Sequence, residues 1–121
     1  MSNAEYRGIQ PSGGLSVRGE SFVTQSLGYV QHLAARHPDL YETIVRYEMA
    51  PGTRDALLEA GARGPGLLLE EMGFGNMPAI EKGMADAVHI KAEFRAVTYG
   101  LRPGSVDIFN SRILGFGELG L

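Results

Sequence analysis

Glycine is the residue that most constrains how this chain can fold. Seventeen of its 121 residues are glycine, and they are spread along the sequence instead of gathered in one stretch. Glycine adopts turn conformations at little steric cost, so glycines spread in this way indicate a chain that turns often. We therefore expect short helices and strands joined by turns, and no flexible linker.

The size and composition of the chain predict one folded domain. A chain of 121 residues has room for a single hydrophobic core. Its hydrophobic share of 44% and its charged share of 21% are ordinary for a folded soluble protein. The longest apolar runs are a few residues long, far below the roughly 20 needed to cross a bilayer, and no signal-peptide pattern is present. We expect no contact with a membrane.

Several classes of site are excluded or disfavoured by residue content. The chain has no cysteine, which excludes disulfides, thiolate metal sites and cysteine nucleophiles. The three histidines, His32, His37 and His89, are too few and too scattered for a zinc site, so we expect no metal. The formal net charge of −3 gives no overall basic surface for nucleic acid.

The first four residues differ in character from the rest. Met1-Ser2-Asn3-Ala4 is typical of a start codon followed by a vector-derived scar. We therefore expect the natural sequence to be a single domain over residues 5–121, cut from a longer protein.

The first half of the chain predicts three strands and two helices. Strands are expected at residues 6–9, 21–24 and 43–49. Ser26 is placed to cap a helix whose apolar residues recur at helical spacing until His37-Pro38. A second, short helix over residues 56–60 is expected to end at Gly61.

The second half predicts a long loop followed by strands. Residues 64–83 are expected to form an extended surface loop with a helical turn at 67–72. Strands are expected at residues 88–94, 97–101 and 106–109, and further apolar residues close the sequence. With helices early and strands late, we expect an α+β fold with a mostly antiparallel sheet.

The strand over residues 88–94 carries the clearest chemical pattern. Because strand side chains alternate, His89, Lys91 and Glu93 share one face. A base, a cation and an acid in one row can transfer protons or stabilise a developing charge. The alternative is a solvent-exposed strand face with alternating charge.

Two other groups of residues are candidates for binding. Arg7 can bind a phosphate through two hydrogen bonds, and Gly8 allows a ligand to approach the backbone closely. Ser21, Thr24 and Ser26 offer hydroxyls on a strand that leads into a helix. The alternatives are a surface ion pair for Arg7 and turn and capping chemistry for the hydroxyls.

Taken in order, these segments resemble the bacterial ADP-ribosyltransferase toxin domains. That family uses an arginine on its first strand, a hydroxyl-rich second strand followed by a helix, and a glutamate on a late strand. The corresponding segments here are Tyr6-Arg7-Gly8, residues 21–26 with their helix, and residues 89–93. Lys91 departs from the family, which often has Glu or Gln two residues before the glutamate.

The resemblance implies a fold and a set of roles. It implies a split, two-sheet, mostly antiparallel α+β fold that binds NAD between the sheets. Arg7 and Gly8 would bind the dinucleotide together with Ser21, Phe22 and Ser26, while Thr24 would orient the glutamate. Glu93 would stabilise the oxocarbenium-like ribose as nicotinamide leaves, although Glu118 on the terminal segment is an alternative acid. The loop over residues 73–83 would lie where the acceptor is presented.

The resemblance also implies a biological setting. The expected activity is transfer of ADP-ribose from NAD to a target-cell macromolecule, with protein favoured over RNA because the chain is not basic. The domain would be the effector module of a larger polymorphic toxin, secreted or delivered by contact, used in interbacterial competition and acting in the cytoplasm of the target cell. A cognate immunity protein is implied as a partner.

Two other functions remain open from the residues alone. The first is a metal-independent ribonuclease toxin, in which His89 and Glu93 are acid and base and Lys91 or Arg7 binds the phosphate. The second is a non-enzymatic interaction module whose charged strand face is a solvated surface or a partner interface.

Overall fold

The computed structural model describes residues 1, 14–15, 21–41, 44–64, 67–80, 84, 86–93 and 96–119. The described chain forms an α+β fold with two mostly antiparallel sheets and a few short helices, as expected. The predicted strand at residues 6–9, with Arg7 and Gly8, lies outside the described residues.

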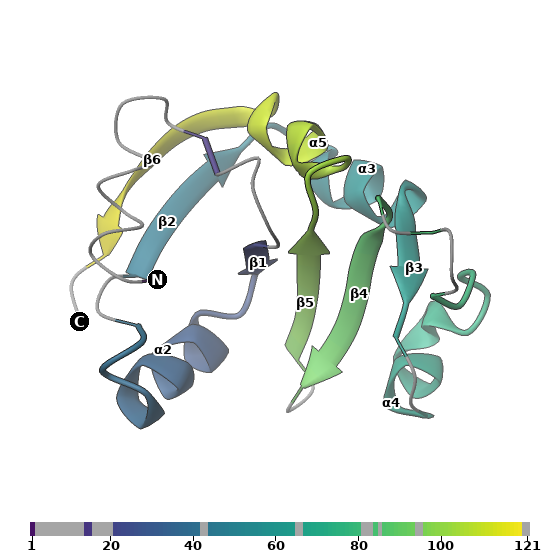
Figure 1. The fold of residues 1–121 in the computed structure, drawn as a ribbon, viewed down its shortest axis with the longest axis horizontal. Coiled ribbons are helices and arrows are strands. Elements are labelled where there is room, and N and C mark those ends of the chain that lie inside the picture. Colours follow the sequence, from purple (N-terminus) through teal and green to yellow (C-terminus); the bar gives the residue numbers. More distant parts are fainter. Residues whose placement is uncertain are drawn as a thin grey trace.

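The larger sheet has four strands in the order β1-β5-β4-β3 (Figure 1). These strands are β1 (Ser21–Thr24), β3 (Gly61–Arg63), β4 (Val88–Glu93) and β5 (Ala96–Leu101). β5 is antiparallel to both β1 and β4, whereas β3 is parallel to β4. The first strand of the sheet is thus brought next to the last one by a pairing that spans most of the chain.

The smaller sheet pairs two strands that are also distant in sequence. β2 (Ile44–Met49) and β6 (Ile113–Leu119) run antiparallel, with an irregularity in register at Glu48/Met49. Figure 1 shows this curved pair to one side of the larger sheet. The expected strand at residues 43–49 is confirmed over β2, and β6 forms from the closing apolar residues, to which the sequence pattern assigns no element.

The helices are short. They are α2 (Leu27–Arg36), α3 (Thr53–Glu59), α4 (Leu67–Leu69) and α5 (Val106–Asn110), and a π-helical turn, η1 (Glu70–Phe74), follows α4. α3 and α5 contact each other where the two sheets approach (Figure 1). The predicted cap of α2 is confirmed, because the Ser26 side chain accepts a hydrogen bond from the Tyr29 backbone N–H. No helix in the described residues is both long enough and apolar enough to cross a membrane.

The prediction of a strand at residues 106–109 is wrong, because this segment forms helix α5. The alternation of Val106 and Ile108 suggests a strand, but Val106 and Phe109 are three residues apart and both are buried. On a helix, this spacing places the two side chains on one face, against the core. Burial of that face therefore decides the conformation.

The segment predicted as a loop is more regular than expected. The helical turn at residues 67–72 is confirmed by α4 and the start of η1. After η1, Ala79 forms an isolated bridge alongside Arg63, with hydrogen bonds from the Arg63 N–H to Pro78 O and from the Ile80 N–H to Arg63 O. This contact covers the outer edge of β3, a strand that the sequence did not predict.

One hydrophobic core lies on one face of the four-stranded sheet. Alternate residues of β4 and β5 supply it: Val88, Ile90, Tyr99 and Leu101. The other buried members of the cluster are Leu15, Leu57, Leu69, Val106 and Phe109. The opposite face of the sheet carries the polar residues of β4, and Thr24 of β1 lies on it as well. The core thus fixes which face of the sheet is available for chemistry.

Candidate functional site

The polar face of the larger sheet brings together most of the described candidate residues. β4 is a regular strand, so His89, Lys91 and Glu93 share this face, as predicted. Thr98 of β5 pairs with Lys91 on one side and with Thr24 of β1 on the other. Residues paired across strands point to the same side, so Thr24 lies on the same face as Lys91.

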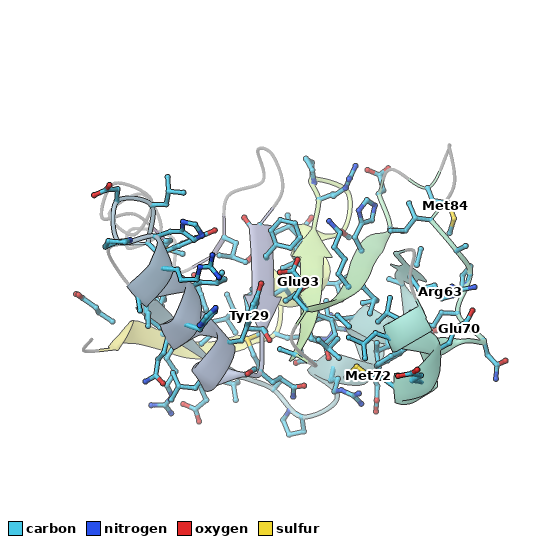
Figure 2. The ribbon with its side chains drawn as sticks, turned by 90° about the horizontal axis from the view of Figure 1, so that it is seen from below. Tyr29, Arg63, Glu70, Met72, Met84 and Glu93 are labelled. Carbon is cyan, nitrogen blue, oxygen red and sulfur yellow. The ribbon has the colours of Figure 1, made fainter. Side chains whose placement is uncertain are left out.

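Glu93 occupies the exposed end of β4. It pairs with Ala96, the first residue of β5, and its side chain is exposed. The Tyr29 hydroxyl donates a hydrogen bond to Glu93 Oε2 from the first turn of α2. Figure 2 labels both side chains and shows Tyr29 of α2 beside Glu93. The carboxylate is thus held at one oxygen while it remains accessible to solvent.

The environment of Tyr29 keeps its hydroxyl protonated. Burial, the hydrogen bond with Glu93 and the negative charge of Glu93 raise the pKa of Tyr29 from 10.0 to about 12, with a further contribution from Tyr41. The phenol is therefore neutral at physiological pH and acts as the donor in this pair. A hydrogen bond from a neutral donor to an ionised acceptor is among the stronger kinds.

The hydroxyl-rich segment positions the start of α2. Thr24 Oγ1 donates to Val97 O at 2.7 Å and accepts from the Ser26 N–H at 3.2 Å. Ser26 Oγ in turn accepts from the Tyr29 N–H at 3.2 Å. These contacts are the turn and capping chemistry that was the alternative for this segment, and they connect Thr24 to Glu93 through Tyr29.

Phe22 and Lys91 form a second feature of this face. The Phe22 side chain is 53% exposed, and Lys91 Nζ lies 5.1 Å from the centroid of its ring, a cation–π contact. Gly100 of β5 pairs with Phe22, and a Cβ at Gly100 would lie 3.0 Å from Phe22 Cε1. The missing side chain at Gly100 therefore lets the Phe22 ring lie across β5 toward Lys91. Ser21, the residue before Phe22, points to the opposite face of β1.

His89 is placed differently from its two partners on β4. Its side chain is only 5% exposed, and its Nδ1 lies 3.1 Å from Arg102 Nη2. A general acid or base must come within hydrogen-bond reach of its substrate. Burial of this side chain therefore disfavours proton transfer between His89 and a macromolecular substrate.

The remaining candidates lie apart from this face or outside the described chain. Glu118 pairs with Val45 in the smaller sheet and is exposed there. Arg7 and Gly8 are not among the described residues. Within the described ranges, no group of three or more His, Asp or Glu side chains is arranged to hold a metal ion.

Tyr29 is the residue at this site that the sequence did not single out. It lies 64 residues from Glu93, and no local pattern connects the two positions. The only sequence signal is its place three residues after the capping Ser26, in the first turn of α2. That place marks a side chain near the end of β1, but it does not identify the partner.

Comparison with known proteins gives a family for the chain. A family model described as the PT3 toxin domain matches residues 1–118. No curated protein matches the chain. Because the family model covers nearly the whole sequence, the chain belongs to the PT3 toxin domain family and is a toxin effector module.

Proposed function

We propose that this toxin domain is an NAD-dependent ADP-ribosyltransferase, in the glycosyltransferase class. The bond from ribose C1′ of NAD to the nicotinamide nitrogen breaks, and nicotinamide leaves with the electron pair. A nucleophile of the acceptor forms the new bond to C1′ and loses its proton to solvent. NAD is consumed as a substrate, and the acceptor is a macromolecule of the target cell.

The observation that carries this proposal is the Glu93 carboxylate, exposed at the end of β4 and hydrogen-bonded by Tyr29. Positive charge develops on the ribose as nicotinamide departs. A carboxylate already oriented toward that charge stabilises the transition state without reorganising during the reaction. Glu93 is thereby suited to the role that the resemblance implies for it.

The neighbouring residues support binding of a dinucleotide on the same face. The exposed ring of Phe22 offers a flat surface on which a planar base can stack, and the ammonium group of Lys91 lies over that ring. Arg7 and Gly8 are proposed to bind the phosphate and ribose, whereas Ser21 lies on the opposite face of β1 and is not part of this proposed surface. Thr24 and Ser26 contribute by placing α2.

The contacts of His89 make a ribonuclease the weaker alternative. That mechanism needs His89 to exchange a proton with RNA, whereas its side chain is buried beside Arg102. The net charge of −3 also favours a protein acceptor over RNA.

The family supports the biological setting that we propose for this activity. We propose that the domain is carried by a larger secreted or contact-delivered toxin and acts in the cytoplasm of the target cell. A cognate immunity protein would protect the producing cell. Each of these points is an extension of the toxin family match.

The test is release of nicotinamide from NAD by the purified domain, alone and with target-cell lysate. We expect Glu93→Gln to lower the rate by about 100-fold or more, because the amide keeps the shape but removes the stabilising charge. Glu48→Gln is the matched control. Glu48 is also an exposed strand glutamate, but it lies in the smaller sheet, so this variant should keep the wild-type rate.

Three results would contradict the proposal. Equal rates for wild type and Glu93→Gln would remove the role of this carboxylate. Loss of activity in Glu118→Gln alone would move that role to the smaller sheet. Degradation of RNA without any release of nicotinamide would favour the ribonuclease.

A further inference from the structure

We propose that Tyr29 is the positioning residue that fixes the Glu93 carboxylate at the end of β4. This inference deepens the proposed function, because it rests on Glu93 being the residue that stabilises the reacting ribose. It also assigns the hydroxyl-rich segment an indirect role, which is to place Tyr29.

The position of Tyr29 is determined by contacts at the start of α2. The Thr24 hydroxyl joins the end of β1 to the carbonyl of Val97 on β5, and it also accepts from the Ser26 N–H. The Ser26 hydroxyl then accepts from the N–H of Tyr29 itself. The first turn of α2 is thereby tied to the same sheet that carries Glu93.

The hydrogen bond from Tyr29 closes a ring of contacts around this end of the sheet. β1 pairs with β5, β5 pairs with β4, and β4 carries Glu93, which returns to α2 through Tyr29. A tyrosine side chain loses few torsional degrees of freedom when it is held in place, so it is an economical anchor for a flexible glutamate. Glu93 lies at a strand end, where fewer neighbours restrain a side chain.

The chemistry of the pair suits a positioning role. Burial and the charge of Glu93 raise the pKa of Tyr29 to about 12, so the hydroxyl stays protonated and continues to donate. Besides Glu93, Tyr41 contributes to this shift. Holding a carboxylate at one oxygen limits its rotation before NAD binds, and such preorganisation acts on the chemical step more than on binding.

The first experiment tests the contact without NAD. Ionisation of Tyr29 is followed by NMR of labelled tyrosines, assigned sequentially through the backbone, in wild type and in Glu93→Gln. We expect a pKa near 12 in wild type and a clear fall in Glu93→Gln, because the negative charge is lost while burial remains. An identical pKa in the two proteins would overturn the proposal.

The second experiment tests the consequence for catalysis. In Tyr29→Phe, which keeps the ring and removes only the hydroxyl, we expect kcat for nicotinamide release to fall about tenfold. The KM for NAD should change by less than about twofold, because the lost contact orients a catalytic group and does not bind substrate. Tyr41→Phe, which removes a neighbouring phenol hydroxyl, is the matched control and should keep the wild-type kcat.

The two experiments separate failure of this inference from failure of the proposed function. If wild type releases no nicotinamide, the proposed function fails, and the titration still decides whether Tyr29 holds Glu93. If wild type is active and folded Tyr29→Phe keeps its kcat, the positioning role is overturned. A fall in melting temperature with unchanged kcat would show a purely structural role, and a Tyr29→Phe protein that failed to fold would leave the titration to decide.

Discussion

The position of the Phe22 ring on the polar face depends on a side chain that a neighbouring residue lacks. Gly100 has no side chain, so the Phe22 ring occupies the space above it, and a Cβ there would also lie 3.2 Å from His89 Cβ. Lys91 gains a flat apolar partner from this arrangement. The missing side chain of one glycine therefore makes room for the contact between Phe22 and Lys91.

The raised pKa of Tyr29 predicts how stability changes in alkaline solution. Folding favours the protonated phenol. Its contribution to the free energy of unfolding is therefore complete below pH 10 and is lost as the pH rises toward 12. We expect the free energy of unfolding of wild type to fall over this range more steeply than that of Tyr29→Phe. Chemical denaturation at a series of pH values measures both. Parallel curves for the two proteins would contradict this prediction.

Some residues of the candidate site could be predicted from the sequence, and others could not. Alternation placed His89, Lys91 and Glu93 on one face, because strand geometry is local. The hydroxyls of Thr24 and Ser26 were found by their position before a helix. The contact between Tyr29 and Glu93 could not be predicted, because it depends on how α2 packs against a strand 64 residues away.

At the scale of elements, α2 connects the strand β1 to the proposed site. Its apolar residues are mostly half-buried or exposed, and only Ala34 is buried among its ten residues. A helix with so little buried surface depends on its cap and on tertiary contacts more than on propensity. Ser26 supplies the cap, and Tyr29 supplies a tertiary contact through its hydrogen bond to Glu93.

Removal of this cap is expected to weaken the protein. Ser26→Ala deletes the acceptor for the Tyr29 N–H, and we expect a loss of about 1 kcal/mol in the free energy of unfolding. The matched control is Ser111→Ala, at the C-terminal end of α5, whose exposed hydroxyl makes long contacts of 3.3 and 3.5 Å. Urea denaturation compares the two variants, and an equal loss in both would be inconsistent with the cap.

Prediction succeeded for elements with an unambiguous period and failed for two short ones, α5 and β3. β4 and α2 show their periods over six and ten residues, and both were predicted. α5 has five residues, too few to separate a period of two from one of 3.6, and tertiary burial decided it. β3 has three residues and begins at Gly61, the residue that was expected only to end α3.

At the scale of the whole molecule, one core connects the larger sheet to the helices. Leu101 is fully buried at the end of β5, in the cluster that also contains Val106 and Phe109 of α5. The smaller sheet joins this core through Tyr47, whose ring packs edge-on against Phe109 with centroids 5.2 Å apart. Damage to this cluster should therefore affect both sheets together.

Truncation of a central core residue tests this connection. We expect Leu101→Ala to cost about 2–5 kcal/mol, because it leaves a cavity in the hydrophobic core. A small domain has a total stability of only about 5–15 kcal/mol, so much of the native state is at risk. Leu114→Ala, at a residue that is 63% exposed on β6, should change stability by less than about 0.5 kcal/mol. Calorimetry should show a single transition at lower temperature for Leu101→Ala, and two separate transitions would refute a shared core.

The order in which the strands pair has a consequence for synthesis of the toxin. Among the described strands, β1 pairs only with β5, and β2 pairs only with β6, so neither sheet can be completed before the strands from Ala96 onward have been synthesised. Such distant pairings also form slowly. A nascent chain that lacks β5 and β6 therefore cannot hold the complete two-sheet fold.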